Sequence, residues 1–157
     1  MMDTSPAMAV AVRALTIYQP WADAIAHLRK DIENRNWVTP YTGLLLVHSA
    51  QRADQAALKE APKDLPGIRG AVIALACLTG CHQCDGTCST WAEPGLWHWK
   101  LTDVTALASP VACLGARKLW VPSNDLRARV ADALAPEAAG LRQQLLAYPT
   151  TRKDPSQ

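Results

Sequence analysis

The stretch "ALTIYQPWADAIAHLRKDIENRNWVTPYTGLLLVHSA", residues 14–50, carries in succession the patterns of a strand, a helix and two further strands. β-Branched and aromatic residues at 13–18 predict the first strand. Pro20 then suits the first turn of a helix, because the N–H that proline lacks would have no partner there. Trp21 and Ile25 lie four positions apart and give the predicted helix an apolar face.

Charged and aromatic residues gather at the end of that helix and in the strand after it: Lys30, Glu33, Arg35 and Trp37. Strand alternation over residues 32–37 places Glu33, Arg35 and Trp37 on one face. In one interpretation, Glu33 and Arg35 form a structural ion pair on a solvated strand face. In the other, Lys30 and Arg35 hold an anion or a base edge in a pocket, while Glu33 accepts a proton or an amino group. Spacing alone leaves both interpretations open.

The rest of the chain indicates short strands interrupted by a few helices. Strands are expected at 44–50, 71–78 and 95–104 with two more within 109–122, and helices at 52–61, from Ser123 or Asn124 onward, and after Pro136. With no internal repeat and no linker, this order predicts an α+β fold, a small and mostly antiparallel β-barrel decorated by several α-helices. We expect a flexible N-terminal arm at 1–12, a single domain at 13–147 and a polar C-terminal tail at 148–157.

The composition excludes several classes of protein. Hydrophobic residues make up 49% of the 157 residues and charged residues 19%, which is typical of a globular domain and not of a disordered chain. The net charge of +2 permits nucleic-acid binding but lacks the strong basic bias of a dedicated electrostatic binder. Six Trp and no Phe suit base-stacking sites as well as a core. The N-terminal apolar run is too short to span a membrane and no basic segment precedes it, so we expect a cytoplasmic protein without a membrane partner.

The five cysteines favour free thiols or metal ligands over disulfides in such a protein. Cys81 and Cys84 have the Cys-x-x-Cys spacing of a zinc knuckle, and Cys88 or His82 would complete the ligands of a structural zinc site. The alternative is a loop with free thiols, in which no cofactor is required. Cys77 lies in an apolar strand and is expected to be a small core residue.

Other polar residues have both a structural and a functional interpretation. His48 ends a buried strand, where it is either hydrogen-bonded within the core or a second-rank residue of a pocket. Arg117 and Lys118 either form a basic rim for a phosphate backbone or belong to a solvated turn. On the last helices, three arginines are expected to cover a solvent-exposed face: Arg127, Arg129 and Arg142.

The stretch at 14–50 resembles the start of the ASCH family, the activating-signal-cointegrator homology domains, whose fold is a PUA-like β-barrel. The residues that carry the resemblance, in the order of the family pattern, are Gln19, Pro20, Trp21, Lys30, Glu33, Arg35, Trp37 and Gly43. One position departs from that pattern, because Leu28 stands where a glycine usually lies two positions before the lysine. Later segments, "GAVIALACL", "GLWHWKLTDVTALASPV" and "GARKLW", extend the likeness over residues 13–121.

The resemblance implies nucleic-acid binding and, for some members, a hydrolase activity. ASCH domains are regarded mainly as modules that bind RNA or other nucleic acids. Some small bacterial members are amidohydrolases that deacetylate N4-acetylcytidine with a lysine, a threonine and a glutamate, and another member is described as a ribonuclease. Lys30 lies at the position of the amidohydrolase lysine, but Glu33 occupies the place of its threonine, so that nucleophile is missing here.

We therefore predict a protein that binds RNA, single-stranded nucleic acid or a modified nucleoside in a cleft lined by Lys30, Glu33 and Arg35. The apolar walls of this cleft are expected to be Trp21, Trp37 and Tyr18. The alternative is a small hydrolase, an N4-acylcytidine amidohydrolase or a ribonuclease, in which Lys30 is the base and Glu33 its partner. The third alternative is a protein-interaction module, which would apply if the protein binds neither a polynucleotide nor a nucleoside.

Overall fold

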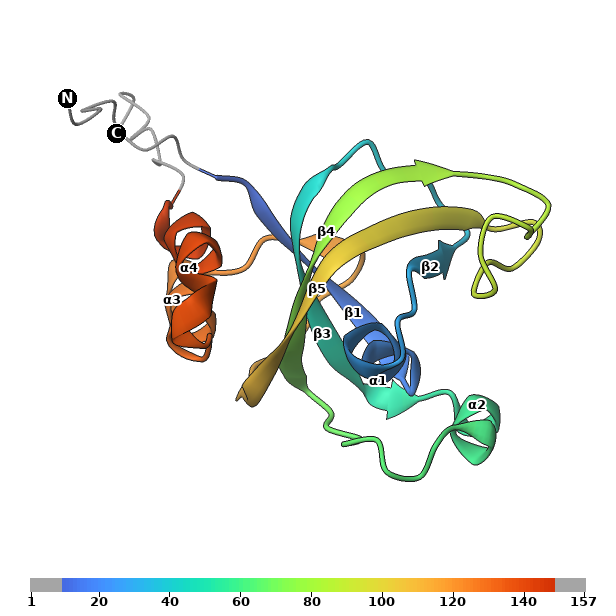
Figure 1. Cartoon of the computed structure of the whole chain (residues 1–157), viewed down its shortest axis with the longest axis horizontal. Helices are drawn as coiled ribbons and strands as arrows, with labels where there is room; N and C mark the ends of the chain where they lie inside the picture. Colours follow the sequence, from blue (N-terminus) through green and yellow to red (C-terminus); the bar gives the residue numbers. More distant parts are fainter. Residues whose placement is uncertain (1–9, 149–157) are drawn as a thin grey trace.

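The computed structural model describes residues 10–148, which form one curled, six-stranded sheet with helices on both of its faces (Figure 1). The strands lie in the order β2-β5-β4-β3-β1-β6. Their bounds are Val12–Gln19 for β1, Ile32–Arg35 for β2, Gly43–Ala53 for β3, Ala71–His82 for β4, Trp97–Ala112 for β5 and Leu119–Trp120 for β6. The helices are α1 at Trp21–His27, α2 at Gln55–Glu60, α3 at Asn124–Asp132 and α4 at Ala139–Leu146, with a 3-10 turn at Pro136–Ala138. Residues 1–9 of the predicted arm and 149–157 of the predicted tail lie outside the described residues.

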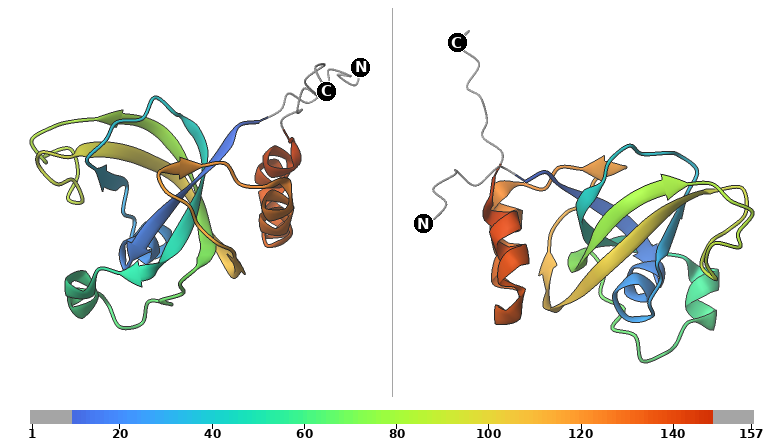
Figure 2. Two further views of the ribbon diagram at one scale, coloured as in Figure 1. Left: turned by 180° about the vertical axis from the view of Figure 1, so that it is seen from behind. Right: turned by 45° about the horizontal axis from the view of Figure 1, so that its top comes forward.

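The sheet is mixed but mostly antiparallel. Neighbouring strands are antiparallel throughout, except that β1 runs parallel to β3, from Val12 opposite Leu44 to Ile17 opposite Ser49. A parallel pair needs a crossover connection, and α1 and β2 supply it here. The sheet curls into a half-barrel (Figure 2), which confirms the predicted α+β fold with a mostly antiparallel, curved sheet.

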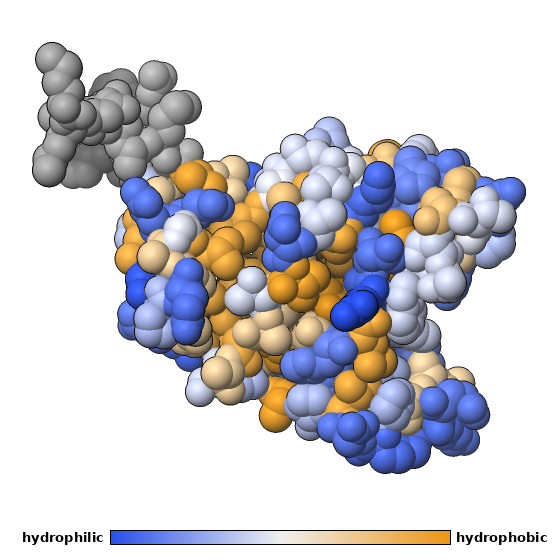
Figure 3. Space-filling model, viewed as in Figure 1, coloured by the Kyte–Doolittle hydropathy of each residue, from blue (hydrophilic) through white to orange (hydrophobic). Residues whose placement is uncertain are grey.

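Two apolar clusters lie on opposite faces of the sheet, because successive side chains of a strand point to opposite sides. In β1, Val12 and Ala14 belong to the cluster beneath α3 and α4, which we call the helical core. Leu15 and Ile17 belong to the cluster beneath α1, which we call the α1-side core. β3 and β4 contribute to both clusters, so their sequences are continuous apolar runs. In the view of Figure 3, apolar side chains gather in the middle of the face and hydrophilic ones surround them.

The described helices are short. The longest, α3, has nine residues. None of the helices within residues 10–148 has the length and apolar character needed to cross a membrane.

Arg127 corrects one expectation from the sequence. It is only 2% exposed and does not lie on a solvent face. Its guanidinium donates hydrogen bonds of 2.7–3.2 Å to four backbone carbonyls: those of Val10, Gln144, Leu145 and Ala147. The last carbonyls of a helix have no partner within that helix, so a buried arginine that donates to them joins α3 to the end of α4.

β1, β3, β4 and β5 all end later than predicted, β4 and β5 by the largest margins. β5 continues to Ala112, so it includes residues that were expected to form a separate short strand. The register between β4 and β5 shifts between Val72 and Ala74, and Pro110 falls in the shifted part of β5, where it needs no N–H for the ladder. β4 continues through Cys81 and His82 of the predicted Cys-rich loop, because both pair with residues of β5.

Candidate functional site

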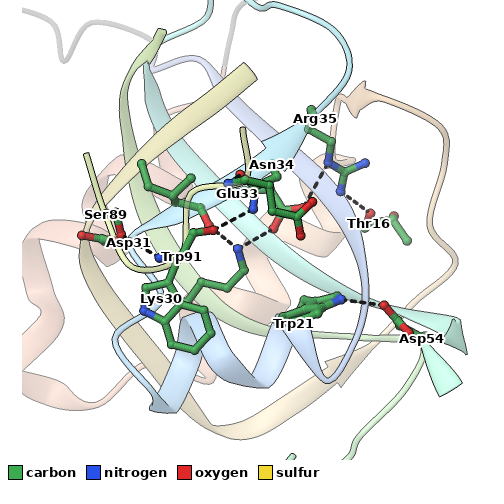
Figure 4. Close-up of polar contacts among 12 residues, drawn as sticks. Thr16, Trp21, Lys30, Asp31, Glu33, Asn34, Arg35, Asp54, Ser89 and Trp91 are labelled. Atoms are coloured by element: carbon green, nitrogen blue, oxygen red, sulfur yellow. Dashed lines mark hydrogen bonds and ion pairs between the residues drawn. The ribbon is translucent and has the colours of Figure 1, made fainter. Parts of the chain in front are cut away.

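Glu33 lies at the centre of the predicted charged cluster, between two cations. Its Oε1 is 3.2 Å from Nε of Arg35 and its Oε2 is 3.6 Å from Nζ of Lys30 (Figure 4). Glu33 is 7% exposed and lies opposite Trp99 in the pairing of β2 with β5. An ion pair between Glu33 and Arg35 is therefore present, but it is largely buried, and a second cation joins it.

Lys30 is buried at the junction between α1 and β2. Its ammonium donates a hydrogen bond to the carbonyl of Ile32 and lies 5.8 Å from the ring centres of both Trp21 and Trp91. Burial lowers the pKa of Lys30, and the carboxylate of Glu33 opposes this effect. The site therefore holds an amine whose charged form depends mainly on the carboxylate of Glu33, with a smaller contribution from Glu93.

The turn that leads into Lys30 accommodates the departure from the ASCH pattern. Leu28, which replaces the usual glycine, has a φ of −115°, a value that any residue adopts. The left-handed conformation in this turn falls on Arg29, with a φ of +58°. Leucine at position 28 therefore introduces no backbone strain.

Two hydrogen bonds fix side chains around Glu33. Arg35 donates from a terminal guanidinium nitrogen to the carbonyl of Thr16 at 3.1 Å, which ties β2 to β1. The indole nitrogen of Trp21 donates to a carboxylate oxygen of Asp54 at 3.2 Å, just before α2 begins. The guanidinium and the indole are thus held in place by neighbouring elements of the fold.

Two adjoining cavities have Trp21, Glu33 and Asn34 as shared walls. The first has a volume of about 300 Å³, and its other walls include Lys30, Trp91 and Glu93. The second has a volume of about 400 Å³, and its other walls include Tyr18, Arg35 and Trp37. Together they are large enough for a small ligand. The cavities bring together these residues of the predicted cleft: Lys30, Glu33, Arg35, Trp21, Trp37 and Tyr18.

One wall of the first cavity comes from residues 83–96, between β4 and β5, which we call the pocket loop. The side chain of Asn34 binds this loop at two points. Its amide nitrogen donates to the carbonyl of Trp91 at 2.8 Å, and its Oδ1 accepts from the N–H of Glu93 at 3.0 Å. None of these three residues was among the predicted candidates, because the first contact joins positions 57 residues apart and no local pattern indicates it.

His48 is a buried histidine that is hydrogen-bonded within the core. It is 2% exposed, and its Nε2 donates to the carbonyl of Cys113 at 3.0 Å. Its Nδ1 then accepts from the hydroxyl of Thr16 at 3.1 Å. Burial lowers the pKa of His48, which favours this neutral form. His48 is not among the residues that line the two cavities.

Arg117 and Lys118 are exposed in the segment before β6, and neither lines the two cavities. The ammonium of Lys118 lies 5.7 Å from the ring centre of Trp37, a wall of the second cavity. One positive charge therefore stands next to the cavity without entering it.

A second cluster of polar side chains lies where the pocket loop leaves the sheet: His82, Cys84, Cys88 and His98. Each offers one nitrogen or sulfur atom, and these four atoms all lie within 4.8 Å of one another. It differs from the predicted zinc ligands in one member, because His98 of β5 takes the place of Cys81. Cys81 and His82 are consecutive residues of a strand and point to opposite faces, and Cys81 packs against the α1-side core. This cluster could hold a metal ion.

The cysteines of this cluster differ in their surroundings from Cys77. The hydrogen bond from the thiol of Cys88 lowers the pKa of Cys84 to about 6. The N–H of Gly86 also donates to Sγ of Cys84, at 3.3 Å. Cys77 is half-buried in β4 and takes no part in the cluster.

Comparison with known proteins agrees with this fold. The family model for the ASCH domain matches residues 15–110. The crystal structure of the ZmASCH S128A mutant protein from Zymomonas mobilis is similar, with a TM-score of 0.55 and 11% sequence identity over 80% of this chain and 97% of that chain. No curated protein matches the sequence. At this identity the structural likeness shows a shared PUA-like fold, and with the match of the family model it leads to one conclusion: the chain belongs to the ASCH domain family.

Proposed function

We propose that this ASCH protein binds single-stranded RNA, or a modified nucleotide, in the two cavities around Glu33. The observation that supports this function is a buried carboxylate oxygen of Glu33 that lacks a hydrogen bond. Its Oε2 is buried and has no hydrogen-bond partner among residues 10–148, although the ammonium of Lys30 is 3.6 Å away. A buried polar atom without a hydrogen bond costs stability, and such atoms in a native protein point to an absent ligand or to water.

A nucleobase has the groups that fit this arrangement. Carboxylates accept hydrogen bonds from the exocyclic amine of cytosine, so Glu33 is the acceptor for a base edge. Trp21 and Trp91 line the same cavity and flank Lys30 (Figure 4), and indole faces are the surfaces on which splayed bases stack. The first cavity is therefore the proposed base site.

The second cavity suits the sugar and phosphate. Arg35 lines it, and 24% of its side chain is exposed, so its guanidinium can reach a phosphate oxygen. Lys118 stands beside Trp37 at this cavity and is the next cation that a backbone would meet. Base binding at Glu33 and phosphate binding at Arg35 together favour a nucleotide over a free base.

The test measures the affinity of the folded protein for single-stranded RNA, single-stranded DNA and N4-acetylcytidine. Glu33→Gln keeps the shape of the side chain and removes its charge, and we expect at least a roughly tenfold loss of affinity, since a hydrogen bond to a charged group contributes about 1.5–3 kcal/mol. Lys30→Ala should weaken binding as well and reduce its salt dependence. The matched controls are Glu137→Gln and Lys59→Ala, which replace exposed residues outside both cavities.

Thermal unfolding of the same variants separates this function from a purely structural role. If Glu33→Gln and Lys30→Ala unfold at much lower temperature while the remaining folded protein keeps full affinity, the cluster is structural and the proposal fails. If affinity falls and the folded state persists, the cluster binds the ligand.

A hydrolase is the second candidate, and one observation favours it. Lys30, whose pKa is lowered by burial, lines the first cavity together with Glu33, Glu93 and Thr90. An amine that loses its proton readily can act as a general base. A hydrolase would form cytidine and acetate from N4-acetylcytidine, or fragments from RNA, and Lys30→Ala would lower kcat more than affinity. If the protein binds these ligands but forms no product, the hydrolase function is ruled out.

A further inference from the structure

The cysteine–histidine cluster is assembled by strand pairing and by the first turn of the pocket loop. His82 ends β4 and lies directly opposite His98 of β5, and their ring centres are 5.5 Å apart. The loop then turns back so that Cys84 and Cys88 both reach Nδ1 of His98. Antiparallel pairing therefore supplies two imidazoles side by side, and the loop adds two thiols.

The distances within the cluster are those of a tetrahedral metal site. Zinc binds sulfur at about 2.3 Å and nitrogen at about 2.0–2.1 Å, so a tetrahedron separates sulfur from nitrogen by roughly 3.6 Å. Nδ1 of His98 is 3.4 Å from Sγ of Cys84 and 3.7 Å from Sγ of Cys88. All four ligand atoms lie within 4.8 Å of one another, so small side-chain movements bring them around one ion.

The hydrogen bond made by Nε2 of His98 fixes the imidazole in the tautomer that can bind a metal through Nδ1. Nε2 lies 2.6 Å from the carbonyl oxygen of Glu93. A carbonyl only accepts, so Nε2 carries the proton and the lone pair of Nδ1 faces the two sulfurs. Metal-binding histidines in proteins are held in this way, by a backbone carbonyl or a carboxylate. His98 is also fully buried, which fixes its ring.

We propose that His82, Cys84, Cys88 and His98 bind one zinc ion in a structural site that closes the base of the pocket loop. Two thiolates and two imidazoles in a tetrahedron suit zinc and disfavour magnesium or calcium, which prefer oxygen. Four protein ligands leave no open position, so the ion holds structure and performs no chemistry. Zinc binding holds both sulfurs as thiolates and both imidazoles as neutral groups, and any thiol proton still present is released to solvent.

The experiment compares the zinc content of the untagged full chain, purified in reducing buffer, with that of single variants. We expect one zinc per chain in the wild type by elemental analysis. Cys84→Ser and Cys88→Ser should each weaken zinc binding by more than the roughly 10–100-fold typical of a change outside the ligand set. Cys81→Ser is the matched control, because Cys81 completes the Cys-x-x-Cys sequence but faces the α1-side core.

A second measurement uses the folded wild type alone and does not depend on how well the variants fold. Cobalt added to the metal-free chain should give the visible bands of tetrahedral coordination and a thiolate charge-transfer band, and zinc should displace it. The proposal is overturned if the wild type takes up neither metal, if Cys81→Ser loses zinc as Cys84→Ser does, or if the reduced chain proves to re-form a Cys84–Cys88 disulfide in preference to binding zinc. None of these readouts involves nucleic acid, so they test the metal site independently of the proposed function.

Discussion

The carbonyl of Glu93 accepts a hydrogen bond from Nε2 of His98 at 2.6 Å, and this bond connects the cysteine–histidine cluster to a wall of the first cavity. His98 lies in β5, which is rigidly paired, whereas Glu93 lies in the pocket loop. We therefore expect a change at the cluster to affect the cavity through this hydrogen bond.

The first prediction concerns metal removal. Because zinc would fix the base of the pocket loop, we expect a chelator to weaken RNA binding by the wild type roughly three- to tenfold, equivalent to about 0.7–1.4 kcal/mol. Affinity is measured by titration with and without chelator, and circular dichroism confirms that the sheet persists. In Cys84→Ser, affinity should be low from the start and insensitive to the chelator. Equal wild-type affinities in both buffers would mean that the loop keeps its place without the metal.

The second prediction concerns Asn34, which binds the pocket loop through Trp91 and Glu93. Asn34→Ala removes both hydrogen bonds, each contributing about 1 kcal/mol, so the loop should open more often. Amide hydrogen exchange of the backbone N–H of Glu93 should become faster, and RNA affinity should fall. Asn124→Ala, at an exposed position of α3, is the control for both measurements. Unchanged exchange at Glu93 would show that other contacts hold the loop.

The third prediction concerns pH. Burial lowers the pKa of His48 in the folded protein from its ordinary value of 6.5, so between these two values the unfolded chain binds more protons than the folded one. The free energy of unfolding should therefore fall as the pH drops below about 6.5, and this loss should end at the folded pKa. His48→Gln should show a shallower fall than wild type in urea unfolding between about pH 7.5 and about pH 5. His27→Gln, at an exposed position at the end of α1, is the matched histidine replacement, and an identical slope in wild type and His48→Gln would contradict the prediction.

The fourth prediction concerns Arg127, which joins α3 to the end of α4. Arg127→Met leaves buried carbonyls without donors, so we expect a loss of about 3 kcal/mol or more in the free energy of unfolding. Arg129→Met is the control, since its ion pair with Asp125 is 4.0 Å long and its hydrogen bond to the carbonyl of Ala112 is also exposed, and it should change stability by about 1 kcal/mol or less. RNA affinity of folded Arg127→Met should match the wild type, because no residue of the helical core lines either cavity. A loss of affinity would show that the two faces are coupled.

Local patterns in the sequence predict much of this fold. The buried strands β1, β3 and β4 and the helix α1 follow from short apolar runs and from Pro20, because burial and turn chemistry are properties of neighbouring residues. β5 is longer than its pattern indicates, since it continues through residues 105–108 and the shifted register accommodates Pro110. Arg127 is misjudged because its partners belong to another helix.

In the candidate site, too, local patterns predict the contacts between near neighbours in the sequence but not those between distant residues. Lys30, Glu33 and Arg35 lie within six positions, so strand alternation suffices to place Glu33 beside Arg35. Trp91 and Glu93 reach Asn34 and the first cavity only because the pocket loop folds back over β2, and the sequence has no local signal for that path. Cys81 shows that a local motif can also mislead. The Cys-x-x-Cys spacing predicts that Cys81 is a metal ligand, but consecutive residues of a strand point to opposite faces, so Cys81 points away from His82.

The alternation in β1 that separates the helical core from the α1-side core has a consequence for how this protein can change. Residues that set stability beneath α3 and α4 are distinct from those around Glu33. A reserve of stability added on the helical side offsets the cost of new side chains in the cavities, and altered ligand preference usually carries such a cost. Stabilising α3 and α4 first is therefore the route by which selection, in nature or in a library, can explore new specificities on this scaffold.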